Sequence, residues 1–491
     1  MKLTREQIGV AIIFLLILGI RLAYTLPLQS YDNDSYFVLR QADAIAHTGL
    51  PLFQDPLSYG GRTFLFPPLF HYVIALFSFF LGLELAAKVV TSLCFALIVI
   101  VTYMITKEIT KNSTIALISS VFAGFVPVMY FEMASFPTHA LSLLLVFLLS
   151  YSILKIEDER FAAVGLMISI LLLLTSVDIF IFLFGLLFYF LMLFLEKQKP
   201  HGREVEMTVF LFLLSLWFFT LLYKKAFLAH GLSILWGNLP QTLLLTYFHE
   251  VSFVEVLYAV GVIPLLLGIY AAYHLVFDSK NRDALLFAGF ALASFLALWL
   301  RLVQLTTGLL FLSVNMIILS SYTMKIASVK VARTKVASLS FLLATAVLIL
   351  FLLTSVAPFF STVSYTPQYA EDLEALAWLR ENTADNATIL GRIEEGFLIN
   401  YEAKRKNAAD SNFLFINNAD QVKKDIDSLF RSRLESEAVR LTTAYGVDYV
   451  FLSRKTQEQY NITSLFYAEG DCFNLVYEKG ALIYASTGCK I

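Results

Sequence analysis

Residues 31–62, YDNDSYFVLRQADAIAHTGLPLFQDPLSYGGR, organise the rest of the chain. This stretch is polar and rich in acidic residues, yet it lies between apolar runs long enough to cross a membrane. Asp32 and Asp34 precede a helical pattern over residues 35–47, which Gly49 is expected to end. The stretch therefore predicts carboxylates at the mouth of a membrane protein.

The composition is that of a protein embedded in a bilayer. Hydrophobic residues make up 58% of the 491 residues and charged residues only 15%, which is far more apolar than a soluble domain. The formal net charge of −2 gives no indication of a nucleic-acid partner. The sequence contains no cluster of Cys and His with zinc-like spacing and no glycine-rich nucleotide loop.

Eleven apolar segments are predicted to span the membrane. They lie at residues 8–26, 86–105, 115–130, 140–154, 161–177, 179–195, 207–223, 254–277, 284–300, 302–322 and 336–356. Lys2 and Arg5 precede the first segment as in a signal peptide, but no small-residue cleavage site follows it. We therefore expect a retained first helix.

The distribution of basic residues predicts the orientation of these spans. With the N-terminus in the cytoplasm, most loop lysines and arginines lie inside, and the short outer loops hold little beyond Lys224 and Lys225. Asp32, Asp34 and everything after residue 356 then face outward. Counting the apolar run 67–83 as a span would invert all later loops, so an interfacial or re-entrant helix is expected there, within a first outer loop of residues 27–85.

After residue 357 the composition becomes that of a soluble domain. Helix-like patterns at residues 366–382 and 421–446 alternate with strand-like patterns at 387–391 and 448–453 and with a hairpin within 471–484. We predict a membrane domain at residues 1–357 and an extracytoplasmic α/β domain at 358–491. Cys472 and Cys489 can pair in such a domain or remain two free thiols.

Asp32 and Asp34 allow two interpretations. Ahead of a helix, they can cap its N-terminus and complement its dipole. Grouped with Arg40, Asp43 and Asp55 in one outer loop, they suit a hard divalent cation such as Mn²⁺ or Mg²⁺, which prefers oxygen ligands and neutralises phosphate charge.

Further polar residues fall on the same outer side. Glu132 and His139 belong to the second outer loop, where they either mark a substrate path or are solvated interface residues. Glu250 lies in the third outer loop, residues 224–253, as a candidate site residue or a solvated charge. Arg301 lies near the outer end of a span, where it either binds a lipid phosphate or snorkels to the surface.

The run DSYFVLR at residues 34–40, followed by Ile45 and Gly49, resembles the first outer loop of oligosaccharyltransferase catalytic subunits, in the GT-C superfamily of membrane glycosyltransferases. The resemblance implies a GT-C-like membrane fold and a sugar donor linked to a polyprenyl carrier. It places Asp34 on the family's essential acid, which binds the metal and engages the acceptor. By position, it places Glu250 on a catalytic Glu and Arg301 on a phosphate-binding Arg.

Two departures from the family pattern bear on sequon recognition more than on glycosyl transfer. Where the family has WWDYG, this chain has RIEEG at residues 392–396, without the tryptophans that contact the Ser or Thr of a glycosylation sequon. Where the second loop of the family has an acidic pair, this chain has Pro137-Thr138-His139. His139 is therefore predicted to replace one acid as a metal ligand, since imidazole suits manganese or iron-group metals better than magnesium.

The leading hypothesis is a membrane glycosyltransferase that moves a sugar or oligosaccharide from a polyprenyl phosphate or diphosphate to a protein, lipid or glycan acceptor on the outer face. Asp34 and Glu250 are predicted to be catalytic and Asp34 and His139 to bind the metal. The predicted substrate-binding residues are Asp32, Arg40, Arg301 and Glu132.

Two alternatives remain open. One is a transferase of single sugars onto lipid, glycan or Ser/Thr. The other is a transporter or a non-catalytic protein that binds lipid-linked glycans. A transporter is expected to carry ionisable residues within its spans, whereas the polar residues here collect at the outer rim.

Overall fold

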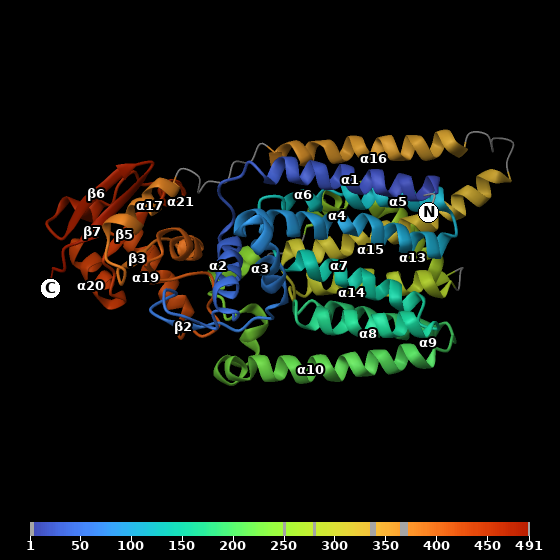
Figure 1. Cartoon of the computed structure of the whole chain (residues 1–491), viewed down its shortest axis with the longest axis horizontal. Helices are drawn as coiled ribbons and strands as arrows, with labels where there is room; N and C mark the ends of the chain where they lie inside the picture. Colours follow the sequence, from blue (N-terminus) through green and yellow to red (C-terminus); the bar gives the residue numbers. More distant parts are fainter. Residues whose placement is uncertain (1–3, 249–251, 278–280, 334–339, 364–371, 490–491) are drawn as a thin grey trace.

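The computed structural model describes residues 4–248, 252–277, 281–333, 340–363 and 372–489. Long helices run side by side in one bundle, and a separate C-terminal domain lies beyond one end of it (Figure 1). The N-terminus lies at the other end of the bundle. This arrangement agrees with a helical membrane domain followed by a C-terminal α/β domain.

Each predicted span coincides with one helix or with two consecutive helices. The bundle consists of α1 (Arg5–Thr25), α4 (Leu83–Thr110), α5 (Ser113–Phe125), α6 (Val128–Phe131), α7 (His139–Leu154), α8 (Glu159–Leu173), α9 (Ile179–Leu195), α10 (Gly202–His230), α12 (Phe253–Val260), α13 (Val262–Phe277), α14 (Arg282–Trp299), α15 (Leu305–Ala332) and α16 (Ser340–Val363). Within the described residues, seven helices, or eight with one bent pair, are long and apolar enough to cross a membrane. The chain is thus a multi-pass membrane protein, and the number eleven stays a prediction.

One predicted span is broken. Residues 254–277 were expected to form a single helix, but α12 and α13 meet at an angle of 104°. Gly261 between them has a φ of +82°, a conformation that residues with a side chain rarely adopt. The apolar pattern continues across this glycine, and for that reason it gave no sign of the break.

Close helix packing in the bundle depends on small residues. At Gly185 of α9, an added Cβ would lie 1.8 Å from the Phe290 ring, and at Gly289 of α14 it would lie 2.8 Å from the backbone nitrogen of Tyr189. Because helices in a membrane associate through packing rather than through the hydrophobic effect, such close approach is a main source of their cohesion.

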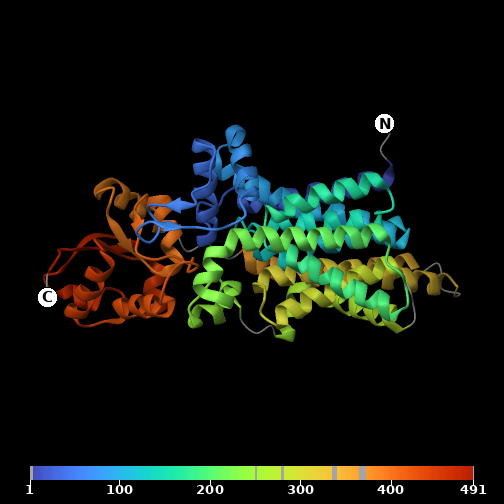
Figure 2. The ribbon, with the colours of Figure 1, turned by 90° about the horizontal axis from the view of Figure 1, so that it is seen from below.

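The first outer loop forms two short helices across the end of the bundle. They are α2 (Asn33–Thr48) and α3 (Leu69–Leu81), joined through the hairpin of β1 (Gln54–Asp55) and β2 (Arg62–Thr63). Both helices run crosswise to the long helices in two views (Figures 1 and 2). The apolar run 67–83 therefore lies across the bundle end, as the topology predicted. Gly49, with a φ of +79°, ends α2.

The third outer loop and the C-terminal domain contain the remaining elements. They are η1 (Gly231–Trp236), α11 (Gln241–Tyr247), α17 (Leu373–Asn382), β3 (Thr388–Leu390), η4 (Ile393–Glu395), α18 (Gly396–Leu398), η5 (Ile399–Ala403), β4 (Lys406–Asn407), α19 (Ala419–Arg431), α20 (Glu435–Tyr445), β5 (Tyr449–Leu452), α21 (Arg454–Tyr460), η6 (Phe466–Glu469), β6 (Phe473–Lys479) and β7 (Ala481–Ser486).

The C-terminal domain is built on one mixed sheet. Among the described residues its strand order is β4-β3-β5-β7-β6, in which β4, β3 and β5 are parallel and β7 and β6 are antiparallel. The predicted strands and the hairpin turn at Gly480 are present, and Gly446 ends α20 with a φ of +60°. α16 continues to Val363, beyond the boundary predicted at residue 357.

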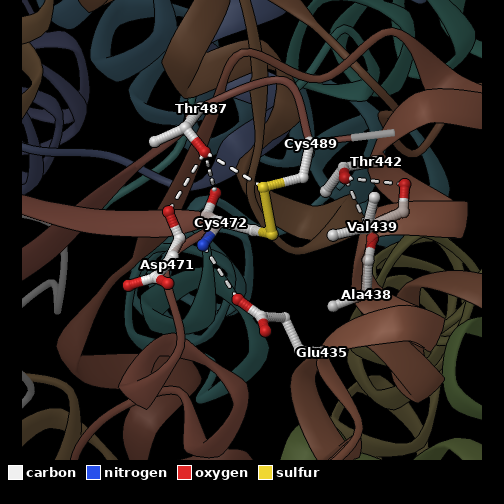
Figure 3. The surroundings of a disulfide bond; sticks show 8 residues. All are labelled: Glu435, Ala438, Val439, Thr442, Asp471, Cys472, Thr487 and Cys489. Atoms are coloured by element: carbon white, nitrogen blue, oxygen red, sulfur yellow. Dashed lines mark hydrogen bonds between the residues drawn. A yellow bond between two sulfur atoms is a disulfide. The ribbon is translucent and has the colours of Figure 1, made fainter. Parts of the chain in front are cut away.

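Cys472 and Cys489 form a disulfide that fastens the end of the chain to the start of β6 (Figure 3). Their Cα atoms are 5.5 Å apart, within the usual range for such a bond. The backbone N–H of Cys472 also donates to Glu435 Oε1 at 2.8 Å. The sequence left open whether Cys472 and Cys489 are paired or free, and in the structure they are paired.

We predict that replacing both cysteines by alanine destabilises the outer domain by about 3 kcal/mol, because a cross-link over a loop of this length restricts the unfolded chain. Thermal unfolding of the double variant measures this change. Cys94→Ala is the control, since Cys94 is a free cysteine in the bundle. An unchanged melting temperature of the double variant would contradict the stabilising role.

Candidate active site

The first turn of α2 presents both predicted carboxylates. Asp32 is the N-cap residue, and its carboxylate accepts hydrogen bonds from the backbone N–H of Ser35, at 3.1 Å, and from the Ser35 hydroxyl. Asp34 lies in the first turn and accepts a hydrogen bond from Ser411 Oγ of the outer domain at 3.2 Å. Asp32 therefore caps α2. Asp34 has no capping role and lies at the junction of the two domains.

The surroundings disfavour the charge of these carboxylates although both side chains reach solvent. Desolvation, followed by the charge of Asp34, raises the pKa of Asp32 to about 7. Desolvation also raises the pKa of Asp34, against the opposing effect of its hydrogen bond from Ser411. A cation or a proton beside this pair is therefore electrostatically favourable.

The second outer loop brings Glu132 and His139 together. Glu132 Oε1 lies 3.6 Å from His139 Nε2, and His139 Nδ1 lies 3.2 Å from the Thr307 hydroxyl. Both side chains are mostly buried, so they are not solvated interface residues. The loop is tied to α2, because the backbone N–H of Phe136 donates to Ser35 Oγ at 2.7 Å.

Arg21 of α1 adds a contribution that was not predicted. Its guanidinium donates to the carbonyl oxygens of Met129, at 2.8 Å, and Glu132, at 3.2 Å, and lies over the Phe95 ring. Burial alone would raise the pKa of Glu132, but His139, Ser135 and Arg21 lower it below the usual value. A single arginine within an apolar first span was the sequence signal for this role.

The third outer loop also reaches this region. Tyr247 of α11 is close enough to Asp34 and Asp32 that their charges, after desolvation, raise the pKa of its hydroxyl. Glu250 lies outside the described residues. Arg301 follows α14 with a φ of +56°, and its carbonyl oxygen accepts a hydrogen bond from Trp236 Nε1 of the third loop at 2.7 Å.

Arg40 is engaged within the first outer loop. Its Nε and Nη2 atoms each donate to a carboxylate oxygen of Asp55 at 2.6 Å, and Nη1 donates to the Asn400 carbonyl at 3.4 Å. Asp55 is almost fully buried. The structure thus shows Arg40 joining α2 to β1 and to the outer domain, and its predicted contact with substrate stays a prediction.

A buried polar interface attaches the outer domain to the first loop. Arg62 pairs with Asp410, which also accepts a hydrogen bond from Ser58 Oγ. Beside this pair, the backbone N–H of Tyr59 donates to Asn407 Oδ1 at 2.7 Å. Asp410 is fully buried and Arg62 nearly so. Arg62 and Asp410 each need the other for the interface to be stable, because an uncompensated buried charge is strongly destabilising.

The segment 392–396, which stands where the resembled family has WWDYG, leads into α18, and α18 packs against α2. Glu395 is fully buried and accepts hydrogen bonds from Ser453 Oγ, at 2.5 Å, and from Arg392 Nε, at 3.1 Å. The next residue but one, Phe397, donates its backbone N–H to Asn33 Oδ1 at 3.1 Å. The carboxylate of Glu395 is therefore held by hydrogen bonds inside the C-terminal domain. The end of the segment lies next to the first turn of α2.

The described residues do not form a ready metal site. No three His, Cys, Asp or Glu side chains among them are grouped closely enough to hold an ion. Asp34 and His139, the predicted ligands, do not belong to one such group. No catalytic step is therefore assigned to a metal from this geometry.

No protein-family model matches the chain, and no curated protein matches it in sequence. Solved structures do match. The oligosaccharyltransferase of Archaeoglobus fulgidus in its apo form aligns with a TM-score of 0.72 and 14% identity over 98% of this chain and 74% of that one. ArnT from Cupriavidus metallidurans aligns with a TM-score of 0.61 and 12% identity over 98% and 97% of the two chains. Arabinofuranosyltransferase AftD from Mycobacteria aligns with a TM-score of 0.62 and 13% identity over 99% of this chain and 40% of that one.

These similarities establish the fold. The chain has the architecture of membrane glycosyltransferases of the GT-C type, and the fold expected from the first outer loop is confirmed. Related structures carry ligands: the Archaeoglobus fulgidus protein has been solved with an inhibitory peptide and a dolichol-phosphate and with Zn and sulfate, and ArnT with undecaprenyl phosphate.

We predict that Arg62→Met destabilises the docked outer domain by about 3–5 kcal/mol, because Asp410 is left as an unpaired buried charge. Limited proteolysis and thermal unfolding report the loss. The double variant Arg62→Met/Asp410→Leu removes both charges and should recover part of the stability. If the single variant unfolds like the wild type, this pair does not hold the domains together.

Proposed function

We propose that this chain is a membrane glycosyltransferase that moves a sugar or oligosaccharide from a polyprenyl phosphate or diphosphate carrier to an acceptor outside the cytoplasm. The observation that carries the proposal is the position of Asp34. It lies on a helix across the end of an apolar bundle and contacts the C-terminal domain through Ser411. The fold is similar to that of an oligosaccharyltransferase, of ArnT and of an arabinofuranosyltransferase.

The residues suggest how transfer proceeds. The acceptor oxygen or nitrogen attacks the anomeric carbon of the sugar, the bond from that carbon to the carrier phosphate oxygen breaks, and the carrier leaves as its phosphate or diphosphate. Asp34 accepts the proton of the attacking group as general base. Arg301 is proposed to bind the phosphate and stabilise its charge.

A divalent cation is part of the proposal. Asp32 and Asp34 offer oxygen donors whose charges repel each other, and His139 offers an imidazole. A bound cation would neutralise phosphate charge. The Archaeoglobus fulgidus structure with Zn and sulfate supports a bound divalent cation. Glu250 completes the proposed catalytic set by resemblance.

The proposed orientation has a cytoplasmic N-terminus and an extracytoplasmic C-terminal domain. Its support is the excess of basic residues in the inner loops and the position of the two termini at opposite ends of the bundle (Figure 1). The disulfide of the outer domain agrees with an oxidising compartment.

The acceptor class has two candidates. An Asn within a sequon is one, since a tethered acceptor peptide with an NVT sequon has been solved on the Archaeoglobus fulgidus enzyme. A specific observation favours the other, transfer to lipid, glycan or Ser/Thr: segment 392–396 lacks tryptophan and Glu395 is engaged inside the outer domain.

We predict that Asp34→Asn lowers the rate of transfer at least about 100-fold, because the general base is lost, and leaves the fold intact. The assay uses purified protein, a native lipid-linked sugar extract, and Mn²⁺ or a chelator. Mass spectrometry then follows peptides with and without a sequon together with lipid acceptors. Asp385→Asn, which changes a fully exposed carboxylate of the C-terminal domain, is the matched control.

Retained turnover of the Asp34→Asn variant would contradict the assignment of this residue. If the wild type binds lipid-linked glycan but transfers none to any acceptor, the protein is a non-catalytic binder. An unchanged rate of transfer in the presence of chelator would contradict the proposed role of a divalent cation.

A second prediction concerns pH. Because the pKa of Asp32 is about 7, its charge develops as the pH rises through neutrality. If ionised Asp32 binds substrate, the transfer rate should rise between pH 6 and 8, about one unit on either side of that pKa. Asp32→Asn keeps the helix cap and should reduce this rise, leaving the part that comes from deprotonation of Asp34, whose pKa is also raised by desolvation. A variant with the wild-type pH profile would show that Asp32 acts only as a cap.

A further inference from the structure

A cavity of about 430 Å³ lies at the end of the bundle opposite Asp34. Its lining comes from the loop between α7 and α8, the end of α9 and the first turns of α10 and α14. Under the proposed orientation it opens at the cytoplasmic surface. Its size is within the range of pockets that bind small molecules or headgroups, and the proposed glycosyl transfer does not use it.

The base of the cavity is an ordered polar network. Arg282 Nε donates to the Tyr189 hydroxyl at 2.9 Å, and Arg282 Nη2 pairs with Glu204. Tyr189 and Glu204 are buried, whereas Arg282 is partly exposed. In the described part of the chain, Nη1 of Arg282 makes no hydrogen bond, so this guanidinium has a donor left for a ligand.

The rim of the cavity carries charges of both signs. Lys155 lies against the faces of Tyr151 and Phe161 and pairs with Glu108 at 3.1 Å, and its side chain remains partly exposed. Asp158 caps α8 by accepting from the backbone N–H of Arg160 at 3.0 Å. Asp283 lies in the first turn of α14. A ligand here therefore meets ammonium, guanidinium and carboxylate groups together.

The helices beside the cavity expose apolar side chains. Val164 and Met167 of α8 and Val205 and Val209 of α10 are all exposed, and both helices lie at the outside of the bundle (Figure 1). In a membrane protein such surfaces face the lipid tails. A molecule with a charged head in the cavity and apolar tails along α8 and α10 fits this surface.

We propose that the cavity binds the headgroup of a zwitterionic aminophospholipid of the phosphatidylethanolamine type. Its phosphate lies near Lys155 and Arg282, and its ammonium lies near Asp158 and Asp283. The lining holds four carboxylates, of which Glu204 pairs with Arg282 and Glu157 lies 3.3 Å from His201 Nε2. Asp158 and Asp283 remain to repel a purely anionic headgroup and to attract an ammonium, whereas Lys155 and Nη1 of Arg282 attract a phosphate. A headgroup with both charges is complementary to both sets.

Native mass spectrometry of the full chain in detergent tests this proposal. The probes are phosphatidylethanolamine, phosphatidylglycerol and phosphatidylcholine with identical acyl chains. We expect phosphatidylethanolamine to bind about tenfold more tightly than the other two, because only its headgroup offers a phosphate together with an ammonium that donates hydrogen bonds.

The variants separate the two halves of the headgroup. Asp158→Asn keeps the cap of α8 and should weaken phosphatidylethanolamine about tenfold, whereas phosphatidylglycerol should bind more tightly because a repelling charge is removed. Lys155→Met should weaken both. Lys199→Met changes an exposed lysine outside the cavity lining and is the control.

Equal affinity for the three lipids, or phosphatidylethanolamine binding that is unchanged in Asp158→Asn and Asp283→Asn, would overturn the proposal. Thermal unfolding confirms that each variant is folded. Lipid binding is measured without sugar donor, so its outcome is independent of glycosyl transfer.

Discussion

The buried ion pair of Arg62 and Asp410 is the constraint on which the candidate site depends. It joins the first outer loop to the C-terminal domain, and its two charges are tolerated in the interior only because Ser58 and the neighbouring backbone also bind them. Fixing the domain in this way brings Ser411 to Asp34 and the backbone of Phe397 to Asn33. The membrane domain alone would leave the first turn of α2 without these partners.

The site is therefore assembled from segments that are remote in sequence. The first turn of α2 supplies Asp32 and Asp34, the second loop supplies Glu132 and His139, and α11 brings Tyr247 into the range of their charges. Arg21 holds the second loop through its carbonyl oxygens. Such an arrangement suits a reaction between a carrier confined to the bilayer and an acceptor that is not, because the reacting groups meet where the bundle ends.

Much of the fold could be predicted because its signals are local. Apolar length identifies the helices, Asp32 and Gly49 delimit α2, and Gly446 and Gly480 end a helix and turn a hairpin. The break at Gly261 was missed because the apolar pattern runs through it. The partners of Arg40, Glu395 and Asp410 were missed for another reason: each pairing is set by tertiary packing, and no spacing in the sequence reveals which distant group lies opposite a charge. Asp34 was predicted from its place in an acidic stretch between apolar runs, and the resemblance supplied its proposed role, whereas Glu250, inferred from the resemblance by position, lies outside the described residues.

A cryo-electron microscopy structure of the protein with a non-hydrolysable polyprenyl-phosphate sugar analogue would show whether Asp34 lies at the reacting centre. We predict that the anomeric carbon lies beside Asp34, between the first turn of α2 and the C-terminal domain, with the polyprenyl chain running into the bundle. A sugar bound at the other end of the bundle, or held away from Asp34 with its carrier phosphate distant from Arg301, would contradict it.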